Sequence, residues 1–131
     1  MTAPGPSELR PRLEAVASLV PRGCALVDIG TDHAGLPITL VQRGLIARAI
    51  AADVADVPCA LARRKVDAAQ LGRLIDVRQS DGWMAIGDGD ANTATLCGMG
   101  GRLIGTLVTR DRPETLGIRT LVMQANKDVP A

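Results

Sequence analysis

The chain has 131 residues, a hydrophobic content of 47% and a formal net charge of +1 at pH 7. This length suits one domain, and the near-zero charge excludes a global field that attracts a polyanion. Phe and Tyr are absent and Trp83 is the single Trp, so a nucleic-acid module that stacks bases on several aromatic rings is disfavoured. Three widely spaced cysteines and one histidine indicate neither a zinc site nor a disulfide framework, and we expect no metal.

The sequence carries no signal peptide or membrane-spanning pattern. Residues 1–7 are small and polar, and no apolar run approaches the roughly 20 residues of a membrane span. We therefore expect a cytoplasmic protein with no membrane contact. A single domain covers 1–131, with a flexible start at 1–7, an N-terminal helix at 8–22, a core at 23–126 and a tail at 127–131.

Helix and strand patterns alternate along the chain. Leu13, Val16, Ala17 and Val20 follow the i, i+3, i+4, i+7 spacing of an amphipathic helix, which Pro21 ends. Further helices are predicted at 34–43, 56–70 and 102–109, and short apolar runs predict strands at 24–29, 48–53, 74–78, 93–97 and 119–124. This alternation predicts an α/β fold with a mostly parallel sheet and helices on both faces.

In such sheets the ligand crevice lies at the carboxyl ends of the strands. The first strand ends in Asp28 and is followed by Gly30, which permits a tight turn before a helix N-terminus. Asp53 ends the second strand, close to the roughly 20-residue offset at which an acid reaches the ribose of an adenosine cofactor. Asp81 and Gly82 follow the third strand, and a glycine-rich loop at 98–101 follows the fourth.

Each of these signals is weak alone. The first loop is not a GxGxxG motif, because Asp32 and His33 occupy its middle, and no P-loop is present. Asp53 also suits a strand-end turn, and Asp81 with Gly82 is an ordinary turn pair. Four such features in register nevertheless favour a nucleoside cofactor.

These segments resemble the bacterial tRNA adenine-N1 methyltransferases that modify adenine 22. The similarity runs from about residue 9 to 126 and includes RLEAVAS at 12–18, DIGTDHA at 28–34, LP at 36–37, DVR at 76–78, GMGG at 98–101 and QAN at 124–126. The chain departs from the family at Gly35, Cys97 and Ala125, where members usually carry Tyr, Ala and Pro. The resemblance implies a Rossmann-like class I methyltransferase core, here lacking the family's C-terminal strands and coiled-coil domain.

The resemblance also implies a cofactor, S-adenosyl-L-methionine (SAM), with S-adenosyl-L-homocysteine as product. It implies cofactor contacts at Asp28, Gly30, Thr31, Asp32, His33, Asp53, Val54, Asp81, Gly82, Gly98 and Met99. Gly100, Gly101 and Asn126 are expected to bind the substrate, with Asp32 and Asn126 orienting the target adenine. Adenine N1 carries a lone pair, so transfer depends mainly on alignment. His33 is expected to be a wall or helix-cap residue rather than a base.

The implied partner is tRNA, and the edge of the last strand predicts self-association into a homo-oligomer. Two other functions stay open. A non-catalytic or truncated SAM-binding remnant would keep the fold without turnover, and an NAD-dependent oxidoreductase is disfavoured by the missing GxGxxG motif.

Overall fold

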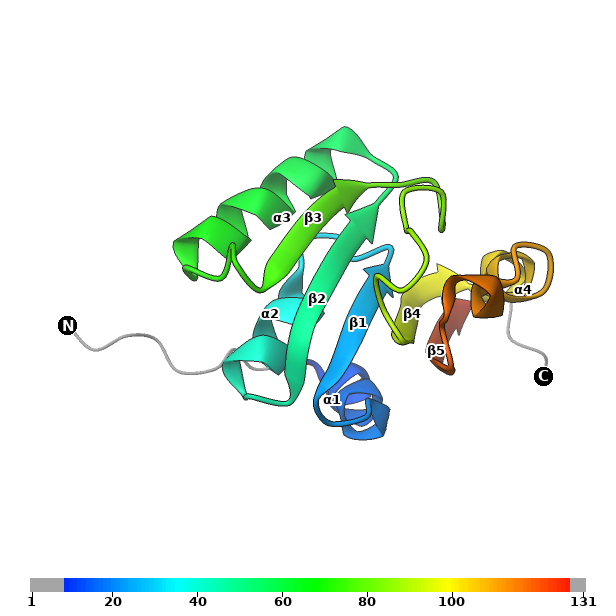
Figure 1. Ribbon diagram of the computed structural model, residues 1–131, viewed down its shortest axis with the longest axis horizontal. Coiled ribbons are helices and arrows are strands. Elements are labelled where there is room, and N and C mark those ends of the chain that lie inside the picture. The colour runs from blue at the N-terminus through cyan, green and yellow to red at the C-terminus, as the bar shows by residue number, and fades with distance from the viewer. Residues whose placement is uncertain (1–8, 128–131) are drawn as a thin grey trace.

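The computed structural model describes residues 9–127 and contains a five-stranded sheet of order β3-β2-β1-β4-β5 (Figure 1). Every neighbouring pair in it is parallel. The strands are β1 (Cys24–Ile29), β2 (Ile46–Asp53), β3 (Ile75–Gln79), β4 (Thr93–Gly100) and β5 (Thr120–Lys127). The predicted α/β fold with a Rossmann-like parallel sheet is confirmed.

Four α-helices and one short 3-10 helix belong to the described residues. They are α1 (Pro11–Leu19), α2 (Gly35–Gln42), α3 (Asp56–Ala68), α4 (Gly101–Thr109) and η1 (Pro113–Leu116). Pro11 occupies the start of α1, where a missing N–H costs no helical hydrogen bond. Gly44, with φ +70°, follows the end of α2 in the left-handed conformation that glycine adopts without strain.

The helices cover both faces of the sheet, and each face buries its own apolar cluster. On one face α1, α2 and α3 pack through side chains that include Val16, Leu40 and Val66. On the other face α4 and the segment 80–92 pack through side chains that include Ile104 and Trp83. Figure 1 shows α3 beside β3 at one edge of the sheet and α4 near β5 at the other. All six residues of β1 are buried, which explains why Asp28 is the only charged residue in its otherwise apolar run.

The fourth strand differs from the prediction. Residues 98–101 were expected to form a loop, and this is wrong: Gly98, Met99 and Gly100 belong to β4, and Gly101 begins α4. The strand continues because Gly98, at φ +72°, forms an irregularity between Cys97 and Met99, after which pairing with β5 resumes.

The boundaries of the chain's ends also change. The first helix is shorter than the predicted 8–22, because Pro21 and Gly23 follow a C-cap at Val20. Lys127 was assigned to the tail, but it pairs with Gly100 as the last residue of β5. The predicted flexible start at 1–7 and the rest of the tail at 128–131 lie outside the described residues, and the single-domain assignment stays a prediction.

Candidate functional site

The site lies where the strand connections change direction. From β1 the chain passes to β2 and β3 on one side, and then returns to β4 and β5 on the other side of β1. In open α/β sheets this switch point leaves a crevice at the carboxyl ends of the two central strands. Here these strands are β1 and β4, so the loop after β1 becomes the centre of the candidate site.

The loop after β1 has an unusual backbone. Gly30, Asp32 and Ala34 all have positive φ, at +72°, +62° and +66°. Asp32 and Ala34 carry side chains, so this conformation costs energy that neighbouring contacts must offset. Asp53 on β2 supplies one of them, since its Oδ2 accepts the backbone N–H of Asp32 at 2.9 Å. Asp53 therefore holds the shape of the loop in addition to presenting a carboxylate beside it.

Asp28 is buried at the end of β1 beneath this loop. Its Oδ2 accepts a hydrogen bond from Thr31 Oγ1 at 2.8 Å, and its Oδ1 accepts one from Thr95 Oγ1 on β4, also at 2.8 Å. Burial raises the pKa of Asp28 to about 6, against the lowering effect of the hydrogen bonds from Thr95 and Thr31, and the negative charge of Asp53 raises it further. At neutral pH Asp28 is therefore a mostly ionised carboxylate in an apolar setting, suited to a cationic ligand group.

A cavity of about 140 Å³ lies between α4 and the segments that follow β1, β2 and β3. It is lined by predicted site residues, Gly30, Asp53, Val54, Asp81, Gly82 and Met99, and by the apolar side chains Ile29, Leu103 and Leu107 together with Ser80. Gly82 has φ +57°, a conformation that favours glycine, and a Cβ there would lie 2.7 Å from Leu107 Cδ2, so a larger residue would also displace the end of that side chain. The carboxylates of Asp53 and Asp81 can accept hydrogen bonds from a nucleoside, and the apolar side chains can pack against its base.

A second cavity, of about 320 Å³, lies on the other side of Gly30. Predicted residues Asp28, Gly30, Thr31, Asp32, His33 and Gly98 line it, together with Leu9, Arg10, Arg12, Leu13, Gly35, Leu36, Cys97 and Gln124. Gly30 is shared by both cavities, and a Cβ there would lie only 2.9 Å from Met99 Cε. The absence of a side chain at Gly30 thus leaves room for Met99, which lines the smaller cavity.

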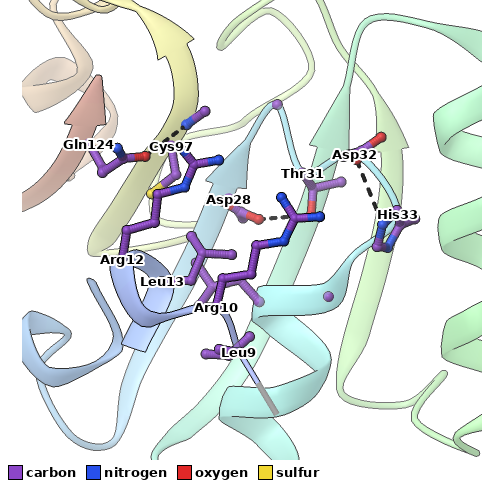
Figure 2. A pocket seen from close by; sticks show the side chains of 14 residues that line it. Leu9, Arg10, Arg12, Leu13, Asp28, Thr31, Asp32, His33, Cys97 and Gln124 are labelled. Carbon is purple, nitrogen blue, oxygen red and sulfur yellow. Dashed lines mark hydrogen bonds and ion pairs between the residues drawn. The ribbon is translucent and has the colours of Figure 1, made fainter. Parts of the chain in front are cut away.

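Two arginines that the sequence reasoning missed reach into this second cavity. Figure 2 shows Arg10 extending toward Asp28 and Thr31, and Arg12 extending toward Cys97 and Gln124. The only sequence signal for them is their position just before and within the first turn of α1. Together with Asp28 they place both signs of charge around one chamber, which suits a zwitterion.

Cys97 lines the same chamber but is not a nucleophile. Burial raises the pKa of its thiol to about 12, and the charge of Asp28 raises it further while Arg12 lowers it. The thiol therefore stays protonated at neutral pH. Cys24, Cys59 and Cys97 are all free of disulfides.

Some predicted site residues do not meet in these chambers. Gly100 and Gly101 line neither cavity, since they form the end of β4 and the start of α4. Asn126 lies in β5. Its side chain is outside what the structure describes, so its role in binding the substrate stays a prediction. Trp83 is buried, and its Nε1 donates to Leu107 O at 2.9 Å, so it is a core residue rather than a stacking surface. Within residues 9–127 no group of three or more His, Cys, Asp or Glu side chains could hold a metal ion.

The fold and the paired chambers define the class of protein. Residues 9–131 match the family model of the methyltransferase domain, and the chain belongs to this family. Among its relatives, the tRNA (adenine(22)-N(1))-methyltransferase of Bacillus subtilis (strain 168) is 38% identical over 119 residues, covering 91% of this chain and 50% of the relative. The resemblance drawn from the sequence motifs is thereby confirmed, and the chain spans about half the length of that relative.

Solved structures agree with this placement. A Streptococcus pneumoniae protein solved in complex with S-adenosyl-L-methionine superposes with a TM-score of 0.86 at 40% identity, covering 92% of this chain and 56% of the other. The M. capricolum TrmK structure, in complex with S-adenosyl-homocysteine, superposes with a TM-score of 0.74 at 34% identity, covering 79% of this chain and 47% of the other.

Proposed function

We propose that the chain is the SAM-binding core of a methyltransferase that transfers a methyl group to N1 of an adenine in tRNA. The observation that carries this proposal is the pair of chambers that share Gly30 as a lining residue. One is lined by the carboxylates of Asp53 and Asp81 together with apolar side chains, and the other is lined by Asp28, Arg10 and Arg12. SAM has the matching parts, an adenosine and a zwitterionic amino acid joined through a sulfonium. The names of the relatives support the same cofactor and substrate.

In this proposal different residues contact different parts of SAM. Asp53 accepts the ribose hydroxyls, beside Val54, and Asp81 with Gly82 holds the adenine. The ionised Asp28 pairs with the ammonium group, and Arg10 and Arg12 face the carboxylate. The backbone of Thr31, Asp32, His33 and Gly98 encloses the amino-acid part, and Met99 packs near the sulfonium beside Gly30. When bound, SAM supplies an activated methyl group, so the protein's task is to align the acceptor.

We assign the alignment of the target adenine to Asp32 and Asn126, with Gly100 and Gly101 leaving space for the base. Adenine N1 is already a nucleophile, so no side chain has to remove a proton before attack. An acceptor such as the Asp32 carboxylate can hold the exocyclic amine and so turn N1 toward the methyl group.

The proposed partners are tRNA and a second copy of the chain. Within the described residues β5 pairs with β4 on one side, and Met123 on it is 49% exposed. Unpaired strand edges are templates for another strand, which supports self-association through β5. No helix among the described residues is long and apolar enough to cross a membrane. A cytoplasmic location is part of this proposal because tRNA is the substrate.

The test is a methylation assay with SAM and a tRNA that carries adenine at position 22. The expected result is 1-methyladenine in the digested tRNA, detected by mass spectrometry, and none in a matched tRNA with guanine at that position. Equal methylation of both transcripts would contradict the proposed acceptor. A protein that binds SAM but methylates neither would instead support the non-catalytic alternative for this chain.

A further inference from the structure

His33 is the chain's only histidine, and its ring lies between charged side chains from two elements. Lys65, near the end of α3, places its Nζ 3.0 Å from His33 Nδ1. On the other side of the ring, His33 Nε2 lies 3.7 Å from Asp32 Oδ2, and Figure 2 shows these two side chains at the rim of the larger cavity. The ring therefore connects α3 with the loop that shapes the candidate site.

The contact with Lys65 fixes which nitrogen carries the ring proton. A lysine ammonium has three N–H donors and no acceptor, so a hydrogen bond at 3.0 Å requires a lone pair on His33 Nδ1. The proton of the neutral ring must then sit on Nε2, the nitrogen that faces the Asp32 carboxylate. A doubly protonated ring is incompatible with this contact, because two donors would face each other.

We propose that Lys65 is a positioning residue that locks His33 as the neutral Nε2–H tautomer and thereby keeps an N–H group directed at Asp32. The Asp32 backbone is already held by Asp53, but its side chain is 73% exposed and has few constraints of its own. A fixed N–H dipole beside that carboxylate favours one orientation of it. In this arrangement the lone pair of His33 Nδ1 accepts from Lys65, so His33 has no lone pair with which to act as a general base.

The consequence for ligand binding rests on the proposed function, whereas the tautomer does not. Asp32 and His33 line the larger cavity and not the smaller one. If the larger cavity holds the amino-acid part of SAM, loss of Lys65 should therefore weaken the contacts to that part of the ligand. The ligand 5′-methylthioadenosine has the nucleoside but no amino-acid part, so its binding should not depend on Lys65. A loss of affinity for SAM without a loss for 5′-methylthioadenosine therefore distinguishes the positioning role from a general loss of structure.

The tautomer is tested by ¹⁵N NMR of the imidazole ring in the full chain, where the single histidine gives one unambiguous set of signals. The wild type should show the Nε2–H pattern above neutral pH. Lys65→Arg retains N–H donors and should keep this pattern, whereas Lys65→Met should give a mixture of tautomers. Arg64→Met, at the exposed neighbouring position on α3, is the matched control and should resemble the wild type. An Nδ1–H or mixed pattern in the wild type, or an unchanged pattern in Lys65→Met, would overturn the proposal.

Calorimetry then tests the consequence. Lys65→Met should weaken SAM binding by about threefold to tenfold, the scale of one hydrogen bond, and leave 5′-methylthioadenosine binding unchanged. Lys65→Arg should restore SAM affinity. Equal loss for both ligands, or no loss for SAM, would overturn the positioning role. If the wild type binds no SAM while the ring keeps its Nε2–H form, the proposed function fails and the tautomer lock stands.

Discussion

Asp28→Asn is expected to change the pH dependence of stability by an amount that the structure sets. Burial raises the pKa of Asp28 to about 6, from the ordinary value of 3.8. One pH unit corresponds to about 1.36 kcal/mol, so ionising this carboxyl costs the folded state about 3 kcal/mol relative to the unfolded chain. Because Asp28 is only 4% exposed, solvent screening reduces this amount little.

The sign of this pH dependence follows from the pKa of Asp28 in the folded and the unfolded states. The unfolded chain loses the Asp28 proton near pH 3.8, whereas the folded protein keeps it to about pH 6. The stabilising contribution of Asp28 is therefore complete below pH 3.8 and is lost as the pH rises through 6. Asparagine has no such titration and keeps an oxygen that can accept from Thr31 or Thr95. The variant should gain about 2 to 3 kcal/mol relative to the wild type between about pH 4 and pH 8.

Urea unfolding followed by far-UV circular dichroism, at several pH values, measures this difference. Glu14 and Asp90 have lowered pKa values, since Arg43 and Arg78 donate hydrogen bonds to them, and their stabilisation is lost as the pH falls. Both proteins share these groups, so their contribution cancels in the difference. Asp88→Asn, at an exposed loop position, is the control. A difference between Asp28→Asn and wild type that stays constant with pH would refute the reasoning.

Three further predictions follow from the site and the sheet. Asp53→Ala should weaken SAM binding about tenfold or more in calorimetry, because charge-assisted hydrogen bonds are lost, whereas Asp56→Ala on α3 should not; unchanged affinity in Asp53→Ala would exclude the ribose assignment. Gly30→Ala should cost about 1–2 kcal/mol of unfolding free energy, since its φ is +72°, and a loss near zero would contradict the loop geometry. Sedimentation at micromolar concentration should show self-association, which Met123→Lys on β5 should reduce; a wild type that remains monomeric would argue against the strand-edge contact.

The sequence predicted the strands that carry a local signature. All six residues of β1 are buried, and such a strand appears as a continuous apolar run. The position of Asp53 was also predictable, because a β-strand, a crossover helix and the next strand need a nearly fixed length of chain. The parallel architecture follows from the alternation of these elements. Those parts of the site therefore depend on spacing that is visible along the chain.

Other features depend on contacts between distant segments. Gly98 suggested a turn, and only the pairing of β4 with β5 reveals that the strand continues through it. Thr95 donates to Asp28 across 67 positions, and Lys65 meets His33 across 32. Arg12 lines the site because α1 packs against β5 and α2, which brings its first turn to the same cavity as Asp28 and Cys97. No periodicity or motif encodes these approaches, so the contribution of Arg10 and Arg12 to the larger cavity could not be predicted.

The central claim is that the two chambers together hold SAM. Isothermal titration of the purified chain with SAM, S-adenosyl-L-homocysteine and NAD, side by side, tests it most directly. We expect one binding site that accepts SAM and S-adenosyl-L-homocysteine, with no detectable binding of NAD. Binding of NAD as tight as that of SAM, or failure of SAM to bind the folded chain, would contradict it.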